Sequence, residues 1–196
     1  LPGLAGNEVA IYVTAAQGSG LKGDTIYLKT DFDIASTSHR SAVIHELDHA
    51  EADRAASPTG PVTFPAKVDL ELRAYRAQAR YVFAEMERQS AAERAATAAQ
   101  VAADRMGLVY AGAILEAQTD PARLLPLAEV LLGVAPAPFT ATPAQAATVV
   151  GLPAARVEAA ARADIAATYR ITATDPGVAE GLAGESIIHW IDRIGP

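Results

Sequence analysis

The first third of the chain alternates between apolar and polar positions in short runs. Residues 9–13 are β-branched or aromatic apart from one alanine, and residues 25–30 alternate between two faces. A stretch with glycine and serine at residues 16–20 separates the two runs. Short alternating runs bounded by turn residues are typical of strands. The pattern therefore predicts a hairpin or a small antiparallel sheet near the N-terminus.

The spacing of apolar residues then changes to that of helices. Three hydroxyl side chains at residues 36–38 can cap a helix. We expect this helix to continue to residue 56, with an apolar stripe of Val43, Ile44 and Leu47. Prolines and a glycine at residues 57–61 end it. A second amphipathic helix is predicted over residues 66–89, where core-facing residues recur at steps of three and four: Val68, Leu72, Tyr75, Ala79, Val82 and Met86.

From residue 91 onward the chain is rich in alanine and has the composition of helices. Asp120-Pro121 and Thr142-Pro143 each place a capping side chain before a proline at a first helical position. A linker is expected at residues 133–138. The pattern as a whole predicts an α+β fold. Its first domain covers residues 1–118 and holds the small antiparallel sheet, and a mainly helical C-terminal lobe covers residues 119–196.

The composition narrows the classes of function. The net charge is -7, with 16 Lys and Arg against 23 Asp and Glu, so no nucleic-acid partner is expected. The absence of cysteine excludes thiol catalysis, disulfides and thiolate metal sites. No apolar run has the length of a membrane span, so no membrane partner is expected either. The chain begins at Leu1 without a leader, and we expect a soluble protein, either processed (and secreted) or a domain of a longer one.

The segment His45-Glu46-Leu47-Asp48-His49 carries the clearest chemistry. His45 and His49 are four residues apart on a predicted helix, so their rings project from one face. Two imidazole nitrogens can then reach one tetrahedral zinc ion. Glu46 lies about 100° around the helix from His45, where it can contact an activated water without being a ligand. Zinc lowers the pKa of such a water, and the carboxylate takes its proton as the water attacks a carbonyl.

A catalytic zinc site needs a third protein ligand, with the fourth position open. Glu71 is favoured because it lies 22 residues after His49, on the second predicted helix and beside its apolar stripe. Its carboxylate can therefore point into the interface between the helices. A carboxylate there without a positive partner would be costly, which itself suggests a metal. Three other carboxylates remain open as the third ligand: Glu51, Asp53 and Asp69.

With His45-Glu46-x-x-His49 and the downstream Glu71-x-x-Ala74, the chain resembles the zincin metallopeptidases whose third ligand is a glutamate, the gluzincins. Residues 23–28 and 41–50 are similar to short bacterial domains of this class, which often accompany polymorphic toxins or contractile injection systems. The chain departs from the thermolysin-like pattern. Residues 67–75 lack the Asn-Glu pair and the Asp four residues after the ligand Glu that this branch carries.

The resemblance implies a zincin-like fold in which an edge strand pairs with an extended substrate above the active-site helix. Residues 25–30 are the expected edge strand. His189 and Tyr75 are candidates for stabilising the oxyanion, and each also fits a packed position without a catalytic role. Four other residues are expected on the protein surface: His39, Arg73, Arg76 and Arg80.

Together these features predict a zinc-dependent metallopeptidase that hydrolyses a protein or peptide substrate, with Glu46 as the general base. Two alternatives remain. An inactive zincin would bind a protein partner through its edge strand, and a metal-dependent amidase would act on cell-wall or small-molecule amides. Glu46 favours an enzyme, because a purely structural metal site has no need of a carboxylate at that position.

Overall fold

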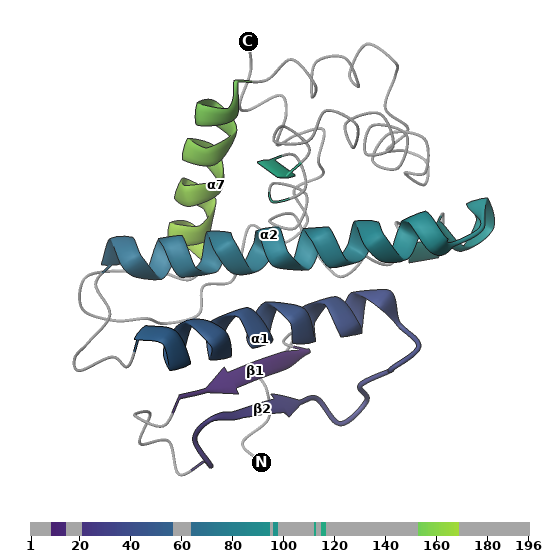
Figure 1. The fold of residues 1–196 in the computed structure, drawn as a ribbon, viewed down its shortest axis with the longest axis horizontal. Coiled ribbons are helices and arrows are strands. Elements are labelled where there is room, and N and C mark those ends of the chain that lie inside the picture. The colour runs from purple at the N-terminus through teal and green to yellow at the C-terminus, as the bar shows by residue number, and fades with distance from the viewer. Residues whose placement is uncertain are drawn as a thin grey trace.

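The described part of the chain is mostly helical, with a small antiparallel sheet of two strands (Figure 1). The computed structural model describes residues 9–14, 21–56, 64–94, 96–97, 112, 115–116 and 153–168. In chain order the elements are β1 (Ala10–Val13), β2 (Thr25–Leu28), α1 (Thr37–Ala56), α2 (Phe64–Arg88) and α7 (Ala154–Thr168). The expected mixture of helices with a small sheet is confirmed. The predicted caps before Pro121 and Pro143 and the linker at residues 133–138 lie outside the described residues, and the division into two domains stays a prediction.

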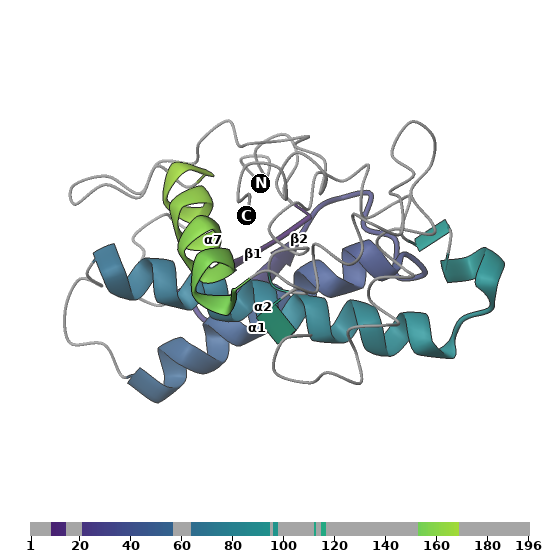
Figure 2. The ribbon, with the colours of Figure 1, turned by 90° about the horizontal axis from the view of Figure 1, so that it is seen from above.

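Helix α1 lies between the sheet and α2 (Figure 1). Helices α1 and α2 run antiparallel, and α7 packs on the side of α2 that faces away from α1 (Figures 1 and 2). The buried residues of α7 lie on one face of that helix: Val157, Ala161 and Ile165. The core of the described part therefore has α2 at its centre and α1 as the layer that meets the sheet.

Strands β1 and β2 pair with Tyr12 opposite Ile26. The N–H of Lys29 donates to the carbonyl of Val9 at 3.0 Å. Hydrogen-bonded and non-bonded pairs alternate along an antiparallel ladder, so the backbone N–H of Tyr12 points away from β2. Strand β2 ends at Leu28, two residues before the expected end. Figure 1 shows β1 between α1 and β2, so the backbone groups of β1 that β2 does not use face the helix.

The first turn of α1 is held by the loop that precedes it. Ser36 caps the helix, because its Oγ accepts the N–H of His39 at 3.2 Å. The expectation that His39 is a surface residue is wrong, since its exposed fraction is 9%. Its Nδ1 accepts the N–H of Asp33 at 2.8 Å, and its ring lies 5.6 Å from that of Phe32. The loop before α1 folds back over the first turn of the helix, and His39 accepts the backbone N–H of Asp33 in this loop. The sequence pattern does not reveal this fold of the loop.

The interface between α1 and α2 combines apolar and polar contacts. Gln78 donates to the hydroxyl of Ser41 at 3.0 Å, and both side chains are buried. Arg40 donates to the hydroxyl of Tyr81 at 2.6 Å and to the carboxylate of Glu85 at 2.7 Å. Tyr75 is partly exposed, and the rest of the predicted stripe of α2 is buried: Val68, Leu72, Ala79, Val82 and Met86. The spacing of apolar residues thus identified the inward face of α2 correctly.

Three arginines that were expected on a solvated face of α2 also make ion pairs. Arg73 and Arg80 are exposed, as expected, and Arg76 is partly exposed. Arg76 and Arg80 both contact the carboxylate of Glu116, while Arg73 contacts Asp48 of α1. These arginines therefore connect α2 to α1 and to Glu116 through ion pairs.

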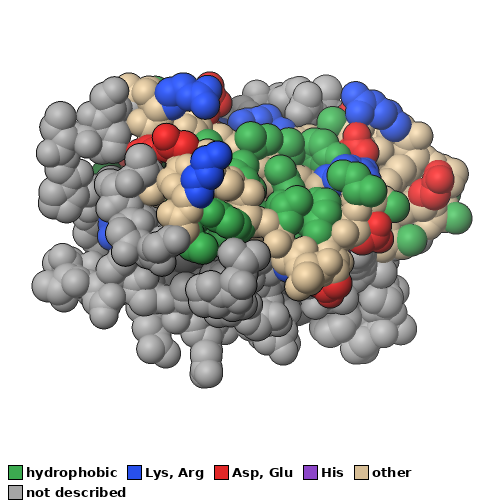
Figure 3. Space-filling model, turned by 90° about the horizontal axis from the view of Figure 1, so that it is seen from below, with side chains coloured by type: hydrophobic (Ala, Val, Ile, Leu, Met, Phe, Trp, Pro, Cys, Tyr) green, Lys and Arg blue, Asp and Glu red, His purple; other side chains and the backbone are tan. Residues whose placement is uncertain are grey.

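The face shown in Figure 3 gathers apolar side chains between charged ones. Among the described residues, Leu28, Ile34 and Leu47 are the large hydrophobic side chains that stay exposed. Leu47, which was expected in an apolar stripe of this helix, is exposed. It lies about 200° around the helix from His45, whose ring turns toward α2, so Leu47 points to the opposite side. Among the same residues, no helix combines the length and the apolar character that a membrane span needs.

Candidate metal centre

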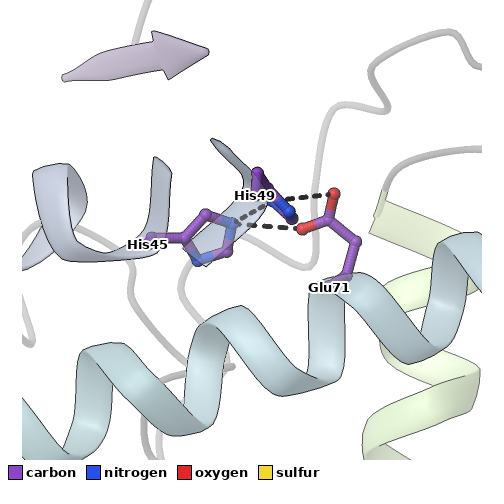
Figure 4. A group of neighbouring side chains, drawn as sticks. All are labelled: His45, His49 and Glu71. Carbon is purple, nitrogen blue, oxygen red and sulfur yellow. Dashed lines mark hydrogen bonds and ion pairs between the residues drawn. The ribbon is translucent and has the colours of Figure 1, made fainter. Parts of the chain in front are cut away.

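Two helices bring three donor groups together (Figure 4). His45 and His49 project from α1 one turn apart, and Glu71 reaches toward them from α2. One donor atom from each residue lies within 4.8 Å of the other two. A spacing of four residues puts both rings on one helix face, and the antiparallel packing of α2 supplies the carboxylate opposite them. The structure thus brings together the three residues that the sequence favoured as zinc ligands.

The distances between these donors suit a tetrahedral ion. The Nε2 atom of His45 lies 3.2 Å from Oε2 of Glu71 and 3.1 Å from Nε2 of His49. The Nε2 atom of His49 lies 3.4 Å from Oε1 of Glu71. A tetrahedral zinc ion with ligand distances of about 2.0–2.1 Å needs ligand atoms about 3.3–3.4 Å apart. The three separations are close to this value, with each histidine facing a different oxygen of Glu71. Three protein ligands leave one corner of the tetrahedron for another ligand.

These three contacts cannot each be an ordinary hydrogen bond with its own proton. Each imidazole carries at most one hydrogen on Nε2, so two hydrogens would have to serve three contacts. A cation between the donors satisfies all of them together. His45 is 6% exposed, and its Nδ1 finds no hydrogen-bond partner in the described part of the chain. The ring of His45 points its Nε2 atom toward His49 and Glu71. Its Nδ1 atom, on the other side of the ring, is buried without a hydrogen bond.

The charges in the group favour an ionised carboxylate. Burial raises the pKa of Glu71, but the hydrogen bonds and charges of His45 and His49 outweigh burial and lower this pKa to about 2. Burial lowers the pKa of His49, but the hydrogen bond and charge of Glu71 outweigh it and leave this pKa raised. The site therefore offers a negative carboxylate beside two histidine side chains, a set of residue types typical of catalytic zinc.

Glu46 lies next to this group on a neighbouring face of α1. Its Oε2 accepts the backbone N–H of Tyr12 in β1 at 2.8 Å. Burial raises the pKa of Glu46. The charges of His45 and His49 and the Tyr12 amide lower it, the charge of Glu71 raises it, and the net effect is a raised pKa. A carboxyl group with a raised pKa is better suited to accept and return a proton near neutral pH.

The strand beside the site is β1, not β2. The hydrogen bond from Tyr12 to Glu46 joins β1 directly to α1, and β2 lies on the far side of β1 (Figure 1). Residues 25–30 were expected to supply the edge strand for a substrate. β2 is the strand of the sheet farther from α1, and its pairing with a substrate stays a prediction. The strand that immediately precedes the helix in sequence is the outer one of the hairpin, and strand composition does not reveal this order.

The other carboxylates that were open as a third ligand lie elsewhere. Glu51 is exposed on α1. Asp53 accepts the hydroxyl of Tyr12 at 2.9 Å, and Asp69 forms an ion pair with Arg162 of α7. Each of these side chains is thus directed to solvent or to another partner. Only the favoured candidate stands with the two histidines among the described residues.

The two candidates for oxyanion stabilisation differ in what can be said of them. The ring of Tyr75 packs edge-on against His45, with centroids 4.6 Å apart and an angle of 69° between the planes. Tyr75 therefore lies beside the donor group, and its role in stabilising an oxyanion stays a prediction. His189 lies outside the described residues, so its role also stays a prediction.

Two contacts around the site were not foreseen from the sequence. Arg73 donates from Nε to the carboxylate of Asp48 at 2.8 Å and from Nη2 to its backbone carbonyl at 2.9 Å. Asp48 lies inside the five-residue motif, so this pair braces the turn of α1 that carries the histidines. The second contact is the attachment of Tyr12 to α1. Opposite charges at residues 48 and 73 hinted at the first contact, and nothing in the sequence indicated the second.

No protein-family model, curated protein or solved structure matches the chain. The interpretation of the site therefore rests on the five-residue motif and on the geometry of its side chains.

Proposed function

We propose that this protein is a zinc-dependent metallopeptidase of the zincin type, with a glutamate as the third zinc ligand. The observation that carries the proposal is the cluster of His45, His49 and Glu71 at tetrahedral spacing, with the Glu46 carboxylate beside it. Zinc bound by these residues would act as a Lewis acid that polarises a substrate carbonyl and acidifies a water molecule.

Residues beside the ligands have the remaining roles in the proposed reaction, which are proton transfer and stabilisation of the oxyanion. Glu46 takes the proton of the attacking water and returns it to the leaving amine, as a general base and then a general acid. Its raised pKa and its place beside the donor group suit it to both steps. Tyr75, which packs on His45, is our candidate for a hydrogen-bond donor to the oxyanion. An extended protein or peptide segment is the proposed substrate, because the outer edge of β2 has no strand neighbour among the described residues and such an edge can pair with an extended chain.

The test combines zinc content with hydrolysis. The wild-type protein, saturated with zinc and desalted, should retain about one zinc per chain and cleave an unstructured protein such as casein. Glu46→Gln should keep its zinc and its fold while hydrolysis falls by at least about 100-fold. The matched control is Glu51→Gln, which makes the same change at an exposed position of the same helix and should leave both properties unchanged.

Each contrary result removes a different part of the proposal. A wild-type protein without zinc would refute the metal centre. Loss of zinc from Glu46→Gln would make that residue a ligand and not a general base. Full activity in Glu46→Gln would refute the peptidase mechanism. A zinc-loaded protein that cleaves small amides but not peptides would be an amidase, and one that cleaves neither would be a binding module.

A further inference from the structure

Tyr12 attaches β1 to α1 at two points. Its backbone N–H donates to Oε2 of Glu46 at 2.8 Å, and its hydroxyl donates to Oδ2 of Asp53 at 2.9 Å. We propose that Tyr12 is a positioning residue, whose two-point clamp on Glu46 and Asp53 fixes the orientation of the Glu46 carboxylate beside the donor group. The catalytic consequence of the clamp rests on the proposed function, while its existence does not.

The spacing of the two acceptors explains why one residue can hold both. Glu46 and Asp53 are seven residues apart, so they lie on nearly the same face of α1, about 10 Å apart along the helix axis. The backbone nitrogen and the phenol oxygen are opposite ends of a tyrosine, and an extended side chain laid along the helix can reach both positions. The clamp therefore runs along the face of α1 that meets β1.

The backbone end of the clamp is the N–H of Tyr12, which makes no hydrogen bond within the sheet. The pairing of β1 with β2 turns the N–H groups of Ile11 and Val13 toward β2 and that of Tyr12 away from it. Glu46 supplies the acceptor for this outward N–H. The bond fixes one carboxylate oxygen, Oε2, and leaves Oε1 as the oxygen for a proton. Fixing one oxygen of a general base in this way limits the orientations of the other.

The phenol end of the clamp is directed mainly at Asp53. A phenol has one hydrogen to donate, and the oxygen of Asp24 is also near, at 3.2 Å, on the exposed side. The bond to Asp53 is shorter and partly buried. Burial raises the pKa of Tyr12, and the two carboxylates raise it further, so the phenol stays protonated and can donate. Asp53, once a candidate for the zinc site, thus has a different function in the fold.

The exchange of backbone amide hydrogens in the metal-free protein tests the clamp directly. Tyr12→Phe removes only the hydroxyl, and Asp53→Ala removes its acceptor. Each should speed exchange of the residue 12 amide at least about tenfold, because the bond to Glu46 loosens once the side chain is no longer held. The amides of Ile11 and Val13, which face β2, serve as internal references and should change little.

Two further variants separate a specific clamp from general loss of packing. Asp53→Asn keeps an oxygen acceptor for the phenol and should restore near-normal exchange. Tyr27→Phe removes the hydroxyl of the tyrosine on β2, which contacts the backbone of Lys22 and not α1, and should leave the residue 12 amide unchanged. Unchanged exchange of that amide in both Tyr12→Phe and Asp53→Ala would overturn the clamp.

The kinetic arm uses the zinc-loaded protein. Tyr12→Phe should lower kcat about tenfold while KM and zinc content stay within about twofold of the wild type, because the clamp orients a proton acceptor and neither binds metal nor adds binding energy. Faster amide exchange with an unchanged kcat would overturn the positioning role. If the wild type hydrolyses no peptide, the proposed function fails, and the exchange result alone then decides whether the clamp exists.

Discussion

The substitution Glu71→Gln tests the metal centre through a single change of charge. It replaces a carboxylate by an amide of nearly the same shape, so the packing of α2 against α1 should be kept. The Glu71 side chain is 18% exposed and contacts both His45 and His49. Its carboxylate is already in place for an ion between these residues, so binding requires little rearrangement, and the loss of its charge should appear directly in the affinity for zinc.

The size of the effect follows from the electrostatics of the site. The pKa of Glu71 falls from 4.5 to about 2 in the fold, which corresponds to about 3 kcal/mol in favour of the carboxylate form. The two histidines produce this lowering against the opposing effect of burial. Zinc in the same place carries more positive charge than the imidazoles. Glu71→Gln should therefore weaken zinc binding by at least about 100-fold, since each tenfold corresponds to about 1.4 kcal/mol.

A competition titration with a chromophoric zinc chelator measures this affinity. Glu51→Gln, on the exposed side of α1, and Asp69→Asn, in the surface ion pair with Arg162, are the matched controls and should stay within a few-fold of the wild type. The reasoning is refuted if Glu71→Gln binds zinc as well as the wild type. A large loss in Asp53→Asn instead would put the third ligand on α1 itself and remove the basis for the gluzincin proposal.

Two further predictions concern stability. Gly112→Ala should lower the midpoint of thermal unfolding, although alanine normally stabilises a helix by about 1 kcal/mol relative to glycine, because the new Cβ would lie 2.7 Å from the backbone oxygen of Tyr75. A higher midpoint would contradict this close approach. In urea, the metal-free wild type should lose stability as the pH falls from 4.5 toward 2, because the lowered pKa of Glu71 contributes stability above this range that protonation removes. Glu71→Gln should lack this part of the pH dependence, and equal slopes for the two proteins would contradict it.

The ends of the two long helices were predictable because the sequence marks them locally. Helix α1 was expected over residues 36–56 and covers Thr37–Ala56, and α2 was expected over residues 66–89 and covers Phe64–Arg88. Hydroxyl caps, prolines and apolar spacing act within a few residues of each boundary. The second strand was harder. It ends where the N–H of Phe32 turns back to the carbonyl of Lys29 at 3.1 Å, a turn that strand propensity alone does not indicate.

The donor group was predictable for a similar reason, with one additional step. His45 and His49 are neighbours on any helix, so their convergence needed only the assignment of α1. The prediction of Glu71 also required knowing which face of α2 points inward, and the apolar stripe of that helix indicated this face. The surroundings of His39 depend instead on a loop that folds back, and the partner of Asp53 depends on which strand of the hairpin lies inside. The loop around His39 and the order of the two strands are tertiary arrangements. The local spacing of residues in the sequence does not predict them.

Helix α1 separates the two halves of the proposed chemistry by the faces on which they lie. His45 and His49 point toward α2, which contributes Glu71, while Glu46 points toward β1 and Tyr12. The direction of Glu46 differs by roughly 100° from that of His45 and by roughly 60° from that of His49. Metal binding and positioning of the general base therefore depend on different neighbours of one helix. Loss of the carboxylate on α2 should therefore remove zinc while leaving the residue 12 amide protected in the metal-free protein. Loss of the phenol on β1 should expose that amide while zinc stays bound. If either change produced both effects, α1 would be responding as a single unit and the separation of the two faces would be wrong.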